Sequence, residues 1–233
     1  MTCSARIVNY DGCELTVIPM SPINQELMRK QVEDIEIRLI DGRSITNEQR
    51  RKIFAICTDI GKETGHSTEE VRKSLRNDFC DLYDIDHFSL STVDMTTARE
   101  FISFLIDFCM NWDIPTRDVL LHYCDDIEQY LYMCLANRKC AICNAHAEVH
   151  HVDRIGMGFD REQIVHEGLR AIALCRRHHA IAHLREKTLF EKNHVFGIPL
   201  DRNLCEILNL RASEDGSDDE ELQPDISDHD AVL

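Results

Sequence analysis

Cysteine and histidine residues are crowded into one segment of the chain, and their spacing limits how that segment can fold. Eight of the twelve histidines lie between His146 and His194. The same stretch contains a Cys-x-x-Cys pair at 140 and 143, a His-His pair at 150 and 151, and the run Cys-Arg-Arg-His-His-Ala-Ile-Ala-His at 175–183. Cys and His at such spacings are typical metal ligands. They are too many for one tetrahedral ion, so the segment predicts two metal sites.

Four of these side chains have the spacing of a structural zinc site. Cys140 and Cys143 form one close pair, and Cys175 and His178 form a second pair farther along the chain. Two such pairs supply the four ligands that Zn²⁺ takes in a closed tetrahedral site. We therefore predict a Cys3His zinc site that holds the C-terminal part of the chain together. Eight further cysteines lack such partners and are expected to be buried free thiols: Cys3, Cys13, Cys57, Cys80, Cys109, Cys124, Cys134 and Cys205.

A second set of histidines remains after the zinc ligands are assigned. His179 and His183 are four residues apart, so on a helix their imidazoles share one face and can bind the same ion. His150 and His151 lie in an extended-looking stretch, where adjacent side chains point to opposite faces. One of this pair can then hold a metal ion while its neighbour meets a substrate. The remaining histidines of the segment, His146, His166 and His194, are expected to lie outside both ligand sets.

This arrangement of Cys-x-x-Cys, a β-like His-His pair and a helical Cys-x-x-His-His-x-x-x-His resembles the HNH nuclease family, with its ββα-metal fold, over roughly residues 138–195. The resemblance implies that His150 is the first ligand of the catalytic ion, that His151 is the general base, and that His179 and His183 complete the ligand set. The chain departs from the family at one position: Arg170 stands where the family usually has an Asn, which holds the loop that presents the base. The nearest polar substitute upstream is His166.

Phosphodiester hydrolysis is the chemistry that these residue types can perform. A neutral His151 can take a proton from water, and a divalent ion such as Mg²⁺ or Mn²⁺ on the other three histidines can polarise a phosphate. Arg176, Arg177 and Arg170 are candidate phosphate contacts. Three alternatives remain open: a single zinc module with incidental histidines, a non-catalytic single-strand DNA-binding recombination mediator with a structural zinc module, and a protein-interaction adaptor.

Charge is distributed unevenly along the chain. The formal net charge is -16, but residues 211–233 hold nine acidic residues against one arginine, the composition of a disordered tail. Residues 138–194 hold ten Lys or Arg against seven Asp or Glu, so the metal-ligand segment is electropositive. The tail is expected either to aid solubility or to cover that basic face until DNA displaces it. No apolar run is long enough to span a membrane, and we expect a soluble cytoplasmic protein.

The front of the chain predicts a β-hairpin followed by helices. Two β-rich runs flank Asp11-Gly12 within residues 5–19. Helical patterns begin near Ser44 and at Ser67, the first lasting until Gly61, and a third runs from about 96 to 110. Residues 116–137 predict one long amphipathic linker helix. The apolar positions expected to face inward in these helices are Ile53, Ile56, Cys57, Ile60, Val71, Leu75, Phe79, Leu82, Phe101, Phe104, Leu105, Phe108, Leu120, Leu121, Ile127, Leu131 and Met133.

Residues 1–115 are similar to the phage Orf (NinB) recombination proteins, through the helix that starts Thr-Asn-Glu-Gln-Arg-Arg-Lys at 46 and the Phe-Ser-Leu-Ser-Thr stretch at 88. That resemblance implies a homodimer that binds single-stranded DNA and works with single-strand-binding protein, in the host bacterial cytoplasm if the chain is phage-encoded. It makes Arg50, Arg51 and Lys52 candidate DNA contacts. The expected fold class is thus α+β: an N-terminal hairpin and helical domain (1–115), a linker helix (116–137), a zinc-stabilised ββα-metal HNH domain (138–210) and a disordered acidic tail (211–233). The expected activity is that of a DNA endonuclease acting on branched, flapped or single-stranded intermediates.

Overall fold

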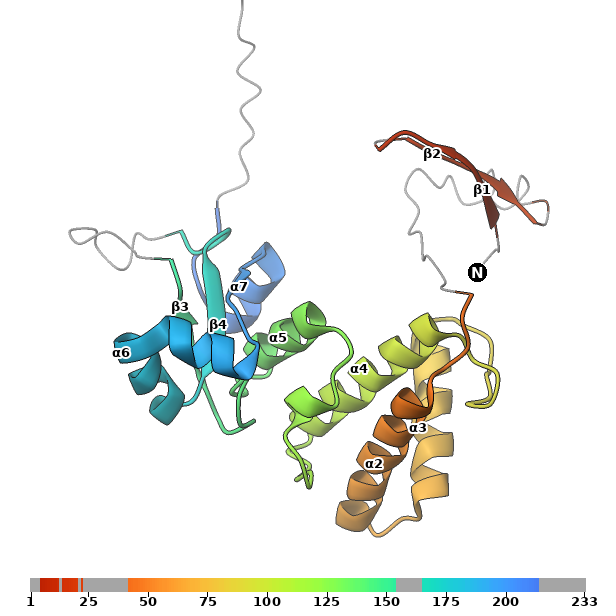
Figure 1. The fold of residues 1–233 in the computed structure, drawn as a ribbon, viewed down its shortest axis with the longest axis horizontal. Helices are drawn as coiled ribbons and strands as arrows, with labels where there is room; N and C mark the ends of the chain where they lie inside the picture. The colour runs from red at the N-terminus through yellow and green to blue at the C-terminus, as the bar shows by residue number, and fades with distance from the viewer. Residues whose placement is uncertain (1–4, 13, 21, 23–41, 154–164, 214–233) are drawn as a thin grey trace, which may run out of the picture.

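A computed structural model shows a mixed α+β chain made of helices and two small sheets (Figure 1). It describes residues 5–12, 14–20, 22, 42–153 and 165–213. The predicted acidic tail therefore falls, from residue 214 onward, outside the described residues, and so do Cys3 and Cys13. Within the described part, no helix has the length and apolar character that crossing a membrane requires.

The predicted N-terminal hairpin is confirmed. Strands β1 (Ala5–Tyr10) and β2 (Leu15–Pro19) pair antiparallel, with Ala5 opposite Pro19 and an irregularity between Ile7 and Asn9. Gly12 lies in the turn with φ +97°, a conformation that L side chains rarely adopt. Because most side chains of both strands are exposed, this sheet contributes little to the core.

Three capped helices follow, and their starts agree with the sequence. Helix α2 (Asn47–Thr64) begins with a capping box between Thr46 and Gln49, and α3 (Thr68–Leu82) begins with one between Ser67 and Glu70. Asp94 caps α4 (Met95–Asn111). The prediction that the first helix ends at Gly61 is wrong, since the helix runs on to Thr64. Gly61 instead allows the backbone of His66 to pass close to the helix: a Cβ at position 61 would lie 2.6 Å from the carbonyl oxygen of His66.

The inward faces of these helices form one apolar core. The four predicted positions of α2 are buried, as are Val71, Leu75 and Phe79 of α3. Phe101 and Leu105 of α4 are buried, whereas its Phe104 and Phe108 are only partly covered. Leu82 is 67% exposed at the last position of α3, so its predicted burial is wrong. Among the described cysteines expected to be buried, five are buried and Cys124 is half-buried; the five are Cys57, Cys80, Cys109, Cys134 and Cys205.

The predicted linker helix over 116–137 is not a single helix. A 3-10 turn, η1 (Leu120–His122), is followed by a separate helix, α5 (Ile127–Ala136), which Asp126 caps. Tertiary bonds occupy the segment that would have formed the first turns: buried Asp59 of α2 accepts from the backbone N and the Nε of Arg117, at 3.1 and 2.6 Å. The predicted inward residues Leu120, Leu131 and Met133 are buried, while Leu121 and Ile127 are partly buried.

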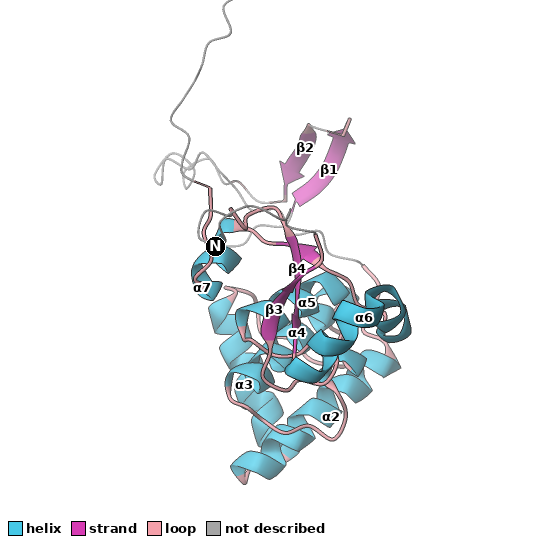
Figure 2. Ribbon diagram, turned by 90° about the vertical axis from the view of Figure 1, so that its left-hand side faces the viewer, coloured by secondary structure: helices cyan, strands magenta, loops and turns pink. Residues whose placement is uncertain are grey.

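The C-terminal part is built on a three-stranded antiparallel sheet in the order β3 (Glu148–His151), β4 (Arg170–Leu174), β5 (Ile198–Pro199). Helix α6 (Arg176–Asn193) packs on β3 and β4, and α5 contacts β4 and the last helix, α7 (Arg202–Leu208) (Figures 1 and 2). Residues Ala171 to Leu174 are all buried, which means that both faces of β4 are covered. Strand β3, strand β4 and helix α6 thus form the expected ββα unit.

Candidate metal centres

The four predicted zinc ligands converge on one point. Cys140, Cys143, Cys175 and His178 each offer a ligand atom, and these atoms all lie within 4.8 Å of one another. The Nδ1 atom of His178 is 3.3 Å from Sγ of Cys140 and 3.4 Å from Sγ of Cys175, and the Sγ atoms of Cys143 and Cys175 are 3.7 Å apart. Bonds of about 2.0 to 2.3 Å to a tetrahedral zinc ion place neighbouring ligand atoms at such separations. The cluster fits Zn²⁺ in geometry and in chemistry.

Two local structures present these ligands. A tight turn carries the first pair, with the Cys140 amide donating to the Ala145 carbonyl at 2.7 Å and Asn144 at φ +56°. Cys175 is the N-cap of α6, and His178 lies in its first turn. The buried hydroxyl of Tyr130 on α5 donates to the carbonyl of Ala141 at 3.1 Å, in the same turn. A bound ion would therefore link the turn to the start of α6, while Tyr130 ties the same turn to α5.

Cys140 and Cys175 of this cluster differ in the direction in which their thiol pKa is shifted. Burial raises the pKa of the Cys140 thiol to about 12. Burial also opposes ionisation of Cys175, yet the backbone N–H of His178 and the neighbouring cysteine side chains hold the pKa of that thiol below its usual range. A cation is the group that would stabilise both thiolates together.

A second, separate cluster joins three of the remaining histidines. His150 on β3 and His179 and His183 on α6 offer ligand atoms that lie within 4.8 Å of one another. The ring centroid of His150 is 4.9 Å from that of His179 and 5.3 Å from that of His183, and the two helical rings are 4.7 Å apart. Two positions one turn apart on α6 and one position on β3 therefore bring together the three histidines that were predicted to share an ion. Imidazole nitrogen is a ligand for several divalent ions.

Two carboxylates contact this histidine cluster, and the sequence did not single out either. Oε2 of Glu186 lies 2.8 Å from Nε2 of His150, and Oε2 of Glu148 lies 3.2 Å from Nδ1 of His179. Burial lowers the pKa of His150, and the bond to Glu186 opposes that shift. Carboxylates beside ligand histidines orient the rings and raise their basicity. Glu186 follows His183 by three residues, but the backbone at Arg185 between them is non-helical (φ -150°, ψ 50°), so helical spacing could not have indicated this contact.

His151, the predicted base, lies outside the three-histidine group and pairs with another histidine. Its Nε2 is 2.9 Å from Nδ1 of His166, with the ring centroids 4.9 Å apart. Burial, followed by the neighbouring His166 and His150, lowers the pKa of His151, which favours its neutral form. His166 belongs to neither ligand group of the described residues, and the sequence alone did not indicate its contact with His151.

The Arg and Lys residues predicted to contact DNA differ in whether their charged groups already bond other parts of the chain. Arg170 is engaged by Asp153, through Nε at 3.0 Å and Nη2 at 2.6 Å to Oδ1. Arg176 and Arg177 are exposed at the start of α6. On α2, Arg50 donates to the carbonyl oxygen atoms of Leu90 and Ser91, and Lys52 bonds Asp125 and Cys124. Arg51 is exposed and contacts its own helix at Asn47.

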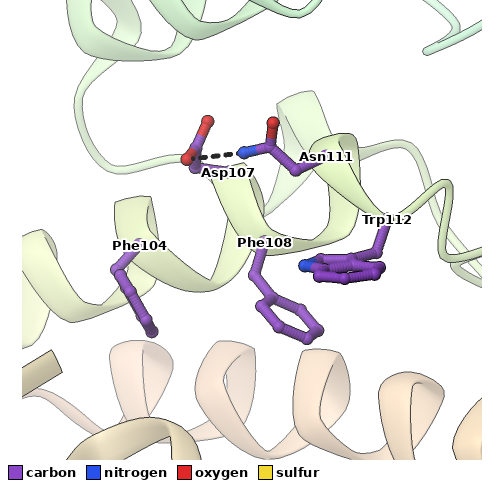
Figure 3. A pocket seen from close by; sticks show the side chains of 5 residues that line it. All are labelled: Phe104, Asp107, Phe108, Asn111 and Trp112. Carbon is purple, nitrogen blue, oxygen red and sulfur yellow. Dashed lines mark hydrogen bonds between the residues drawn. The ribbon is translucent and has the colours of Figure 1, made fainter. Parts of the chain in front are cut away.

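A pocket of about 480 Å³ lies away from both clusters, along α4 (Figure 3). Its lining contains three aromatic rings together with Asp107 and Asn111, whose side chains hydrogen-bond at 2.9 Å. The aromatic residues are Phe104, Phe108 and Trp112. Because the lining has one carboxylate and no cation, it does not suit a phosphate, and it includes none of the clustered histidines or cysteines.

Comparison with known proteins identifies the family. A family model described as "Putative HNHc nuclease" matches residues 18–211, which include both metal-ligand clusters. No curated protein and no solved structure matches the chain. The match covers most of the sequence and spans the zinc-type cluster, the three-histidine cluster and the helices before them. The chain therefore belongs to the HNHc nuclease family.

Proposed function

We propose that this chain is a metal-dependent endonuclease that hydrolyses phosphodiester bonds in DNA. The observation that carries the proposal is the convergence of His150, His179 and His183 at a place distinct from the Cys3His cluster. A purely structural zinc module needs one closed ligand set. A second set with three imidazoles leaves coordination positions for a substrate, as catalytic sites do.

Each group of residues has a separate role in the proposed reaction. Cys140, Cys143, Cys175 and His178 would hold a structural Zn²⁺ at the start of α6. His150, His179 and His183 would hold a divalent ion, such as Mg²⁺ or Mn²⁺, which would supply Lewis acidity for the attack on the phosphate. His151, whose half-buried position lowers its pKa and favours the neutral form, takes the proton of the attacking water. Arg176 and Arg177 hold flanking phosphates from the exposed first turn of α6.

The similarity of residues 1–115 to phage Orf/NinB proteins extends the proposal to a class of DNA substrate and to partner proteins. Branched, flapped or single-stranded DNA of recombination or replication is the expected substrate, with a homodimer and single-strand-binding protein as partners. Among the three predicted DNA contacts Arg50, Arg51 and Lys52, only Arg51 is exposed and not bonded to another element in the described structure, so Arg51 is the DNA contact proposed on α2.

A cleavage assay tests the activity. Purified protein is incubated with plasmid, flap and single-stranded DNA in Mg²⁺, Mn²⁺ or Ni²⁺, beside the variants His151→Ala and His146→Ala. Loss of a general base lowers the rate by about 10²- to 10⁴-fold, so His151→Ala should abolish nicking. His146 is exposed and outside both clusters, so its variant should cut normally.

The same assay separates the endonuclease from its rival, a DNA-binding recombination mediator. Wild-type protein that retards DNA in a gel without cutting it in any of the metals would replace the endonuclease by the mediator. Nicking by His151→Ala at the wild-type rate would refute the base assignment while leaving the enzyme.

A further inference from the structure

The rings of His151 and His166 contact each other directly, although the residues lie 15 positions apart in the chain. The contact joins Nε2 of His151 to Nδ1 of His166 at 2.9 Å. Neither ring belongs to the two ligand groups found among the described residues. The pair is thus a third contact between histidine or cysteine side chains in this segment, beside the two clusters.

The backbone on both sides of the contact is held by the sheet and the C-terminal segment. His151 pairs with Ala171 across β3 and β4, and the next amide, that of Val152, donates to the Arg170 carbonyl at 2.9 Å. The His166 amide donates to the carbonyl of Arg211 at 2.8 Å, and its own carbonyl accepts from Leu169 at 3.1 Å. The folded frame thus sets the distance between the rings.

A hydrogen bond between two neutral imidazoles needs one donor nitrogen and one acceptor nitrogen. When Nε2 of His151 donates to His166, the lone pair of His151 lies on its other nitrogen, Nδ1. When His166 donates instead, Nδ1 of His151 carries the proton and the ring has no free basic atom. A base role for His151 therefore requires His166 to be the acceptor.

We propose that His166 is a positioning residue: it accepts the Nε2 proton of His151 and leaves Nδ1 of His151 as the atom that takes a proton from water. This inference rests on the proposed endonuclease function. The water proton ends on Nδ1 of His151, the hydroxide oxygen forms the new bond to phosphorus, and the bond to the leaving oxygen breaks with its electron pair. His166 stays neutral, orients the ring and stabilises the imidazolium, as the partner of a catalytic histidine does in other hydrolases.

Two substitutions in the full-length, zinc-loaded protein test the role by activity. His166→Phe keeps a planar ring but removes the acceptor. His166→Asn keeps one, because its Oδ1 stands the same number of bonds from Cα as Nδ1 of histidine. We expect His166→Phe to lower kcat by about 10²-fold or more with little change in KM. We expect His166→Asn to retain most of kcat. An unchanged kcat in His166→Phe, or equal loss in both variants, would overturn the proposal.

A second measurement does not depend on cleavage. Two-bond ¹H–¹⁵N correlation spectra of the histidine side chains, at mildly alkaline pH and without added Mg²⁺, report which nitrogen of His151 is protonated. We expect the Nε2–H tautomer in the wild type and in His166→Asn, and a mixture in His166→Phe. An Nδ1–H tautomer in the wild type would overturn the proposal whether or not the protein cuts DNA. A wild-type protein that shows the expected tautomer but cuts nothing would refute the endonuclease function and leave the hydrogen-bond assignment intact.

Discussion

Arg170 and Asp153 tie the end of β3 to the start of β4 through both side-chain and backbone bonds. Two guanidinium nitrogens of Arg170 donate to Oδ1 of Asp153, and its backbone amide donates to Oδ2 at 2.7 Å. This ion pair holds the pKa of the Asp153 carboxyl below its usual range. Arg170 stands where the resemblance to HNH nucleases leads us to expect Asn, and its bonds to Asp153 anchor the chain two positions after His151.

The first prediction concerns the salt dependence of DNA binding. A residue that contacts phosphate changes the slope of log affinity against log salt by about one when it is removed. We expect Arg176→Ala to reduce that slope, because its side chain is exposed at the start of α6. We expect Arg170→Ala to leave it unchanged, because the guanidinium is already engaged by Asp153. Fluorescence anisotropy over a salt series, in a His151→Ala background that leaves the DNA intact, measures both.

The outcome decides between two roles of Arg170. If both variants change the slope equally, Arg170 contacts DNA, and a role in holding the loop is contradicted. We expect Arg170→Ala to change the free energy of unfolding little, because solvent screens an ion pair at such an exposed position.

The second prediction concerns Glu186 and the affinity of the histidine cluster for a divalent ion. Glu186→Ala removes the carboxylate that contacts His150, and loss of such a partner weakens metal binding by about 10- to 100-fold. Glu191→Ala is the matched control, since Glu191 lies on the same helix and pairs only weakly with Lys187, at 3.8 Å. Calorimetric titration of zinc-loaded protein with Mn²⁺ gives both affinities. An unaltered Mn²⁺ affinity in Glu186→Ala would show that this carboxylate does not support the ligand.

The third prediction concerns the structural zinc. Cys140 is fully buried, and Cys140→Ser should abolish zinc binding and unfold the C-terminal part, because binding energies of structural zinc are about 10 to 16 kcal/mol in small modules. Cys205→Ala is the control: it is equally buried, on α7, but outside the cluster, so it should keep its zinc. Elemental analysis and thermal melting measure the effect. A Cys140→Ser protein with full zinc content and the wild-type melting curve would contradict the assignment.

Local features of the chain could be predicted, because they depend on nearby residues. The capping boxes at Thr46 and Ser67 lie within four residues, and the helical spacing of His179 and His183 places both rings on one face. The break in the expected linker helix could not be predicted, because it depends on Asp59, far away in sequence, bonding Arg117. The contact of His166 with His151 depends likewise on the register of β3 and β4, which pattern alone does not specify.

The last prediction concerns Arg50, which the sequence grouped with Arg51 and Lys52 as a DNA contact. Its side chain donates to the Leu90 carbonyl at 2.8 Å and to that of Ser91 at 3.3 Å, so it holds the loop before α4. Removing hydrogen bonds from a charged group costs roughly 1.5 to 3 kcal/mol, and Arg50→Ala should lower the free energy of unfolding by that amount. The DNA affinity of the folded variant should stay unchanged, whereas Arg51→Ala should affect binding and spare stability, because Arg51 is exposed. Urea denaturation and anisotropy distinguish the two; the reverse pattern would place Arg50 at the DNA and leave the loop to other bonds.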